Sequence, residues 1–92
     1  MPRFLLEVEH ESEAIACARA VRALLVSGSH FLTHVDWGCK DGVHSGWVIV
    51  EVDDKAAARA IVPPALRSRA RIVALNGFTL EQVDEILEFH QR

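Results

Sequence analysis

Polar and aromatic residues that could do chemistry fall at alternate positions of three strand-like segments. If each segment is a strand, one histidine, three acids, one tryptophan and one isoleucine share a face: Glu7, His34, Asp36, Trp47, Ile49 and Glu51. A carboxylate beside a half-buried imidazole moves the imidazole pKa around neutrality, as general acid–base catalysis requires. On this interpretation His34 and Asp36 are the catalytic pair. Glu7, Trp47, Ile49 and Glu51 then contact a small organic ligand.

The same residues support two other interpretations. One imidazole and two carboxylates, from His34, Asp36 and Glu7, form a donor set that can hold a divalent ion with positions left open for water or substrate. Alternatively, the residues form a hydrogen-bonded polar patch at a dimer interface, with Trp47 as its apolar anchor. A pocket, a metal site and an interface therefore remain open, and whether the chain is an enzyme remains open with them.

A second, weaker candidate metal site pairs Cys39 with His44. Side chains directly opposite each other in a hairpin are close enough to share an ion such as zinc, or for the imidazole to help form a thiolate. Two ligands do not complete a site, so His10, His30 or a residue of a partner chain would have to join them. Otherwise Cys39 is a small apolar residue beside a solvated histidine.

The elements that position these residues follow from periodicity. Alternating apolar and polar residues predict strands over 3–10, 30–40 and 43–52, and an apolar run predicts a fourth over 72–75. Apolar residues three and four apart predict a helix over 13–26 that ends at Ser27-Gly28, a short helix that ends before Pro63-Pro64, and a third helix begun by a capping box. The buried stripe expected for the first helix consists of Ala14, Ile15, Ala18, Val21 and Leu25.

The Asp41-Gly42 pair predicts a two-residue type I′ turn between the second and third strands. A turn of that length fixes which residues face each other. The expected pairs are Cys39 with His44, Trp37 with Gly46, Asp36 with Trp47, and His34 with Ile49.

The order β-α-β-β-α-β with a terminal helix predicts an α+β domain over 1–92: a ferredoxin-like sandwich with a four-stranded antiparallel sheet and helices on one face. The more apolar sets, Phe4, Leu6 and Val8 with Val48, Val50 and Val52, should meet the helices. The other face is then bare. Because it carries both apolar and ionisable side chains, a partly enclosed cavity suits it better than water or a dry core.

The segments Thr33–Gly38 and Val62–Arg67, together with the element order, resemble the small dimeric α+β barrel proteins. The resemblance implies a homodimer whose sheets pack face to face around a pocket, and the family includes cofactor-independent monooxygenases and isomerases. The leading hypothesis is therefore a homodimer that binds a small organic molecule without a cofactor. The alternative is a non-catalytic module that uses the polar face to bind a divalent metal ion or another protein.

Composition excludes several classes. The net charge of −3 provides no basic field for nucleic acid, and the apolar run 14–18 is far shorter than the roughly 20 residues of a membrane span. The N-terminus lacks the pattern of a secretory signal, so a cytoplasmic location is expected. Cys17 and Cys39 form no CxxC pair, which favours reduced thiols.

Overall fold

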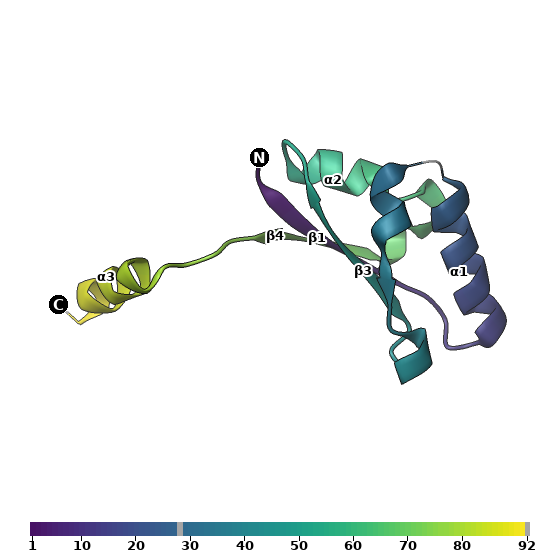
Figure 1. Cartoon of the computed structure of the whole chain (residues 1–92), viewed down its shortest axis with the longest axis horizontal. Coiled ribbons are helices and arrows are strands. Elements are labelled where there is room, and N and C mark those ends of the chain that lie inside the picture. Colours follow the sequence, from purple (N-terminus) through teal and green to yellow (C-terminus); the bar gives the residue numbers. More distant parts are fainter. Residues whose placement is uncertain (28, 92) are drawn as a thin grey trace.

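The centre of the molecule is an antiparallel sheet of four strands in the order β2-β3-β1-β4 (Figure 1). The strands are β1 (Arg3–Glu9), β2 (Asp36–Trp37), β3 (Ser45–Glu51) and β4 (Ala70–Leu75). β1 lies in the middle and pairs with β3 on one side and β4 on the other. This computed structural model describes residues 1–27 and 29–91; Gly28, predicted to end the first helix, lies outside the described residues.

Besides the sheet, the described residues form three α-helices and three 3-10 turns, so the predicted α+β class is confirmed. The helices are α1 (Ala14–Val26), α2 (Lys55–Ile61) and α3 (Leu80–His90), and the 3-10 turns are η1 (His30–His34), η2 (Cys39–Asp41) and η3 (Pro64–Arg69). The predicted capping box is present at α3, where Thr79 accepts from the Gln82 backbone and Gln82 accepts from the Thr79 backbone. Within the described residues, no helix has the length and apolar character needed to cross a bilayer.

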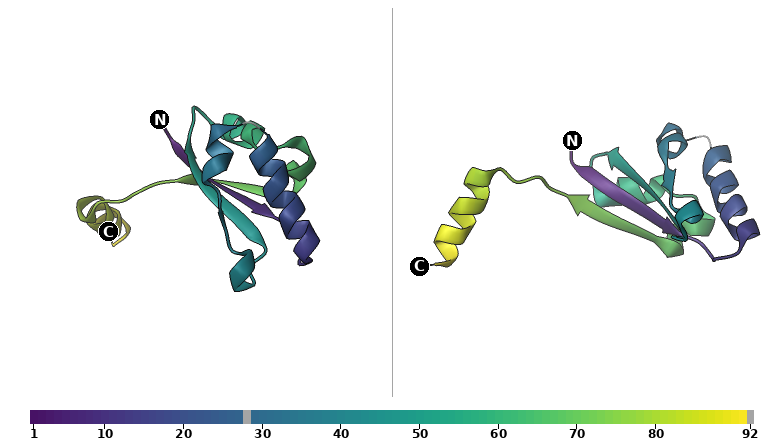
Figure 2. Two further views of the ribbon diagram at one scale, coloured as in Figure 1. Left: turned by 45° about the vertical axis from the view of Figure 1, so that its right-hand side comes forward. Right: turned by 60° about the horizontal axis from the view of Figure 1, so that its bottom comes forward.

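The core lies on one face of the sheet, on the side predicted from residue parity. Phe4, Leu6 and Val8 of β1 are buried with Val50 of β3 and Ile72 of β4. Ala58 and Val62, in and directly after α2, close this cluster, and Phe31 and Leu66 of the 3-10 turns pack against it. Figure 2 shows the helices and turns grouped about the sheet, with α3 standing apart. The residues of opposite parity form the other face of the sheet, the open face.

The strand predicted over residues 30–40 is wrong for its first half. His30–His34 is the 3-10 turn η1, closed by a hydrogen bond of 2.7 Å from Thr33 Oγ1 to the His30 carbonyl. The physical reason is that neighbouring residues of a strand point to opposite faces. In the turn, by contrast, Leu32 is buried while its neighbour Phe31 packs against the core.

The predicted hairpin register is confirmed where a ladder exists, and the predicted turn is wrong. Asp36 lies opposite Trp47 and Trp37 opposite Gly46, but β2 ends there. Because residues 39–41 coil into η2 and only Gly42 adopts a left-handed φ of 78°, the expected Cys39–His44 and His34–Ile49 pairs do not form as strand pairs.

Two tryptophans lock this hairpin by lying over glycines. A Cβ on Gly46 would come within 2.8 Å of the Trp37 ring, and a Cβ on Gly38 within 2.9 Å of the Trp47 ring. Each glycine thus makes room for the indole of the facing strand. This reciprocal packing fixes the hairpin although β2 has only two residues.

The buried side of α1 also differs from the prediction. Ala20 and Leu24 are buried and Cys17 is half-buried, whereas Ile15 and Leu25 of the predicted stripe are exposed. The helix is apolar on nearly every side, so periodicity alone could not select the buried one. α1 contacts η1, and its buried residues lie outside the core cluster.

We expect Gly46→Ala to destabilise the domain by about 1 to 3 kcal/mol, because the added methyl group overlaps the Trp37 ring. Gly77→Ala is the matched control, since nothing lies within 4 Å of the Cβ it would add. Urea unfolding followed by circular dichroism measures both. Equal unfolding midpoints for the two variants would show that the tryptophan-over-glycine packing contributes nothing to stability.

Candidate metal centre

Two connections of the chain meet at one end of the sheet. β1 ends where β3 begins, because Glu9 pairs with Ser45, and the His10 backbone N–H donates to the His44 carbonyl at 3.1 Å. The β1–α1 connection and the segment that contains η2 therefore lie side by side, near the start of α1 (Figure 1). Residues distant in sequence are brought together there.

Three potential metal ligands converge at this junction: His10 directly after β1, Cys17 in the second turn of α1 and Cys39 at the start of η2. Their ligand atoms all lie within 4.8 Å of one another. Around a tetrahedral zinc ion, with bonds of about 2.3 Å to sulfur and 2.0 Å to nitrogen, ligand atoms lie about 3.5 Å apart. With His10 Nε2 and Cys39 Sγ 3.0 Å apart and no pair beyond 4.8 Å, shifts of about an ångström or less in each side chain would bring all three onto one ion.

The imidazole of His10 is already oriented as a ligand. Its Nδ1 lies 2.7 Å from the Glu11 carbonyl oxygen, and because a carbonyl can only accept, Nδ1 must carry the proton. The lone pair of the neutral ring is then on Nε2, which lies 3.0 Å from Cys39 Sγ. A backbone carbonyl that fixes the tautomer in this way is the usual outer partner of a metal-bound histidine.

His44 lies beside this cluster, although it is not one of the residues whose ligand atoms all lie within 4.8 Å of one another. Its ring centroid lies 5.5 Å from that of His10, and its buried Nδ1 has no hydrogen-bond partner among the described residues. Together with Cys17 and Cys39 it lines a cavity of about 290 Å³. A buried nitrogen without a partner is costly, and a bound cation would satisfy it.

Cys39 influences the protonation of the Cys17 thiol. A hydrogen bond with Cys39 raises the pKa of the Cys17 thiol, and burial and the charge of Cys39 act in the same direction. Both cysteines are free thiols. At neutral pH Cys17 therefore keeps its proton in the metal-free protein, and a cation must displace that proton to bind both sulfurs.

The hairpin packing holds this junction in place. The Trp37 ring lies 5.9 Å from the His10 ring, and the Gly38 backbone N–H donates to the Ser45 carbonyl at 3.0 Å, which anchors the chain just before Cys39. His10 is thus enclosed between the tryptophan and His44. Only 8% of its surface is exposed.

The residues of the first predicted site lie elsewhere. On the open face Glu7 accepts a hydrogen bond of 2.7 Å from Trp47 Nε1 and pairs with Arg71 at 3.5 Å. Asp36 is exposed on β2, opposite Trp47, while Ile49 and Glu51 are exposed on β3. His34 is exposed on η1, outside the sheet.

The ligand atoms that converge in the structure are not those of the metal set expected as an alternative interpretation of the first site. In the part of the chain that the structure describes, ligand atoms close enough to share one ion gather at His10, Cys17 and Cys39, and not at His34, Asp36 and Glu7. The weaker candidate pair, Cys39 and His44, contributes Cys39 to this group, and His10 is one of the residues expected to join that pair, beside His30 or a residue of a partner chain. His30 instead stacks on Phe31, with ring centroids 4.1 Å apart.

Sequence reasoning missed Cys17 because it treated the two cysteines as unrelated. The signal was the pairing of the first and third strands. That pairing places the end of one beside the start of the other, so the connections that contain Cys17 and Cys39 must share an end of the sheet.

Comparison with known proteins assigns no family: no family model, curated protein or solved structure matches this chain.

Proposed function

We propose that this chain binds a transition metal ion of the borderline-soft class, zinc first, through the thiolates of Cys17 and Cys39 and the imidazole of His10. His44 completes the set. The observation that carries the proposal is the convergence of three ligand atoms within 4.8 Å, one of them on an imidazole whose tautomer is already fixed. Two thiolates and two imidazoles neutralise and enclose such an ion in the manner of structural zinc sites.

The metal would act as a staple. It would join α1 to the end of the sheet and to η2, and α1 otherwise contributes nothing to the main core cluster. Small domains gain much of their stability from such cross-links, because a single small core supplies little. A closed set of four protein ligands leaves no position for substrate, so the role proposed is binding and stabilisation rather than catalysis.

The open-face hypothesis has less support as a site for an organic ligand. Both Glu7 oxygens already face donors, one from Trp47 and one from Arg71. His34, the proposed proton carrier, lies on η1. The half-buried Trp47 remains a plausible wall for a ligand, and an organic mass retained in native mass spectrometry would support that second candidate.

The ferredoxin-like arrangement and a cytoplasmic location are also retained as proposals. The first is supported by two helices that each follow a strand and return the chain to the same antiparallel sheet. The second is supported by two free cysteines, which a reducing compartment keeps available for metal.

We expect Cys39→Ser and Cys17→Ser each to lower zinc affinity by at least about 100-fold, because each removes a direct ligand and even outer partners contribute about 10- to 100-fold. His34→Ala is the control, and its affinity should equal that of the parent protein. Competition with a chromophoric chelator measures affinity, and elemental analysis of untagged protein measures stoichiometry. Loss of zinc from His34→Ala with retention in Cys39→Ser would restore the first predicted site and refute this one.

Zinc binding should weaken as the pH falls from about 8 to about 6, by up to about tenfold per pH unit for each proton released. The raised pKa of Cys17 keeps that thiol protonated in this range, so binding must expel its proton. Competition titrations in two buffers of different ionisation enthalpy give both affinity and proton release. A pH-independent affinity would mean that the thiols are not ligands.

Without metal the same thiol should give the opposite trend. A folded-state pKa above the unfolded one stabilises the fold at pH below the thiol range, and this contribution is lost as the pH rises through it. The unfolding midpoint of the metal-free protein should therefore fall as the pH rises through the thiol range. In Cys17→Ser the part of this fall that Cys17 causes should be missing. Identical pH profiles for the two proteins would contradict the assignment.

A further inference from the structure

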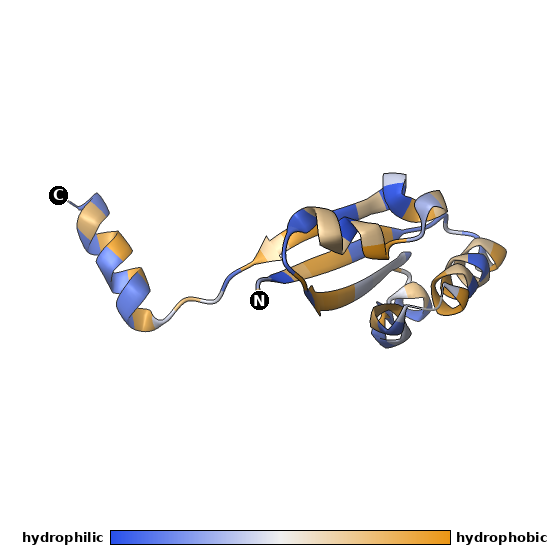
Figure 3. Cartoon of the chain, turned by 90° about the horizontal axis from the view of Figure 1, so that it is seen from above, coloured by the Kyte–Doolittle hydropathy of each residue, from blue (hydrophilic) through white to orange (hydrophobic). Residues whose placement is uncertain are grey.

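The C-terminal helix is amphipathic and stands away from the rest of the chain. Every residue from 76 to 91 is exposed, and α3 has no extensive contact with another described element (Figure 1). One side of the helix is nevertheless apolar, with Leu80, Val83, Ile86 and Leu87 at helical spacing. Figure 3 shows hydrophobic and hydrophilic stretches alternating along the helix.

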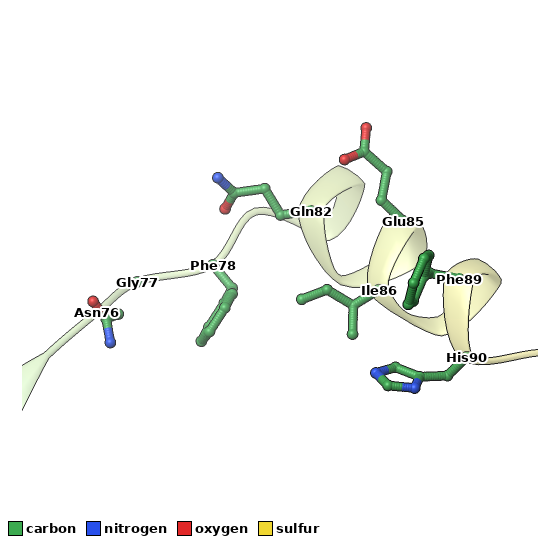
Figure 4. A pocket seen from close by; sticks show the side chains of 8 residues that line it. All are labelled: Asn76, Gly77, Phe78, Gln82, Glu85, Ile86, Phe89 and His90. Atoms are coloured by element: carbon green, nitrogen blue, oxygen red, sulfur yellow. The ribbon is translucent and has the colours of Figure 1, made fainter.

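The linker before α3 extends the apolar side. In Figure 4, Phe78 and Ile86 project to one side of the segment while Gln82 and Glu85 project to the other. The first two, with Phe89, help to line a hollow of about 610 Å³ between linker and helix. Polar side chains complete its lining, namely Asn76, Gln82, Glu85 and His90, so the hollow has an apolar side and a polar rim.

The open face presents a matching apolar row. Leu5 on β1 lies directly between Ile49 on β3 and Val73 on β4. Ile49 is 55% exposed, and Leu5 and Val73 are half-buried. The row is flanked by charged residues: Glu7 and Arg71 on one side, Arg3 and Glu51 on the other.

The chain exposes more surface than a compact monomer of its mass, and the excess is large enough to be buried by a second copy. The chain exposes 6598 Å², whereas a compact monomer of this mass exposes about 5,300 Å², an excess of about 1,300 Å². The radius of gyration is 16.5 Å against about 12 Å for a compact chain of this length. A standard interface buries about 800 Å² of each partner, which this excess can supply.

Charge gives α3 only a local match on the open face. The segment 76–91 has four acids and no lysine or arginine: Glu81, Asp84, Glu85 and Glu88. The open face offers Arg3 and Arg71, and the Arg71 side chain is 70% exposed. Each of these arginines lies beside an acid of its own sheet, since Arg71 pairs with Glu7 and Arg3 lies opposite Glu51, so apolar burial rather than charge carries the contact.

We propose that α3 of each chain packs on the open face of a second copy, so that two chains exchange their C-terminal helices about a two-fold axis. The linker continues outward from the end of β4 and carries α3 away from its own sheet (Figure 2). This direction favours contact of α3 with the sheet of a partner chain over contact with the sheet of its own chain. Both unpartnered surfaces belong to the same chain, so a reciprocal pair covers all of them at once.

The test uses three charge insertions at exposed apolar positions. Leu87→Glu alters the helix, Ile49→Glu the open face, and Leu25→Glu an exposed leucine of α1 that belongs to neither surface; these side chains are 53%, 55% and 55% exposed, so each monomer should fold. Sedimentation equilibrium should show a dimer for the parent and for Leu25→Glu. Leu87→Glu and Ile49→Glu should each weaken dimerisation by about 100-fold.

Mixing the two interface variants distinguishes exchange from other dimers. A heterodimer of Leu87→Glu with Ile49→Glu has one unaltered helix–sheet contact, so the mixture should recover dimer that neither variant forms alone. A monomeric parent protein would overturn the proposal, since it would mean that α3 folds back or remains free. A dimer that survives Leu87→Glu would overturn it too, in favour of sheet-to-sheet packing.

Discussion

The antiparallel pairing of β1 with β3 is the constraint on which the other features depend. It runs from Arg3 opposite Glu51 to Glu9 opposite Ser45. This register places Phe4, Leu6 and Val8 beneath the helices and turns the alternate residues of both strands to the open face. It also brings His10 beside His44. A shift of one residue would reverse the two faces and separate the two connections that form the candidate metal centre.

Much of the fold could be predicted because its signals are local. Alternation located β1 and β3, and the capping box at Thr79 and Gln82 marked the start of α3. The signals failed where two demands competed. The neighbouring residues Phe31 and Leu32 both pack inward, which a strand does not allow, so this segment forms a turn. α1 has too few polar residues for periodicity to select its buried side.

The candidate site was harder to predict because it depends on tertiary contacts. Cys39 and His44 lie five residues apart, and their place near one bend was visible in the sequence. Cys17 and His10 join them only because the sheet places two connections at one end, with the Trp37 ring closing the site beside His10. Single-sequence patterns do not contain that proximity unless strand pairing is worked out first.

The two tryptophans lie in two different environments, which gives the molecule two internal optical reporters. Trp37 stands beside the imidazole and thiol cluster, whereas the Trp47 indole donates to Glu7 on the open face. Quenching by sulfur and imidazole acts over a few ångströms, so emission from the first senses the ligand cluster and emission from the second senses coverage of the sheet. Replacing either ring by phenylalanine therefore separates events on the two faces of the sheet in ordinary fluorescence spectra.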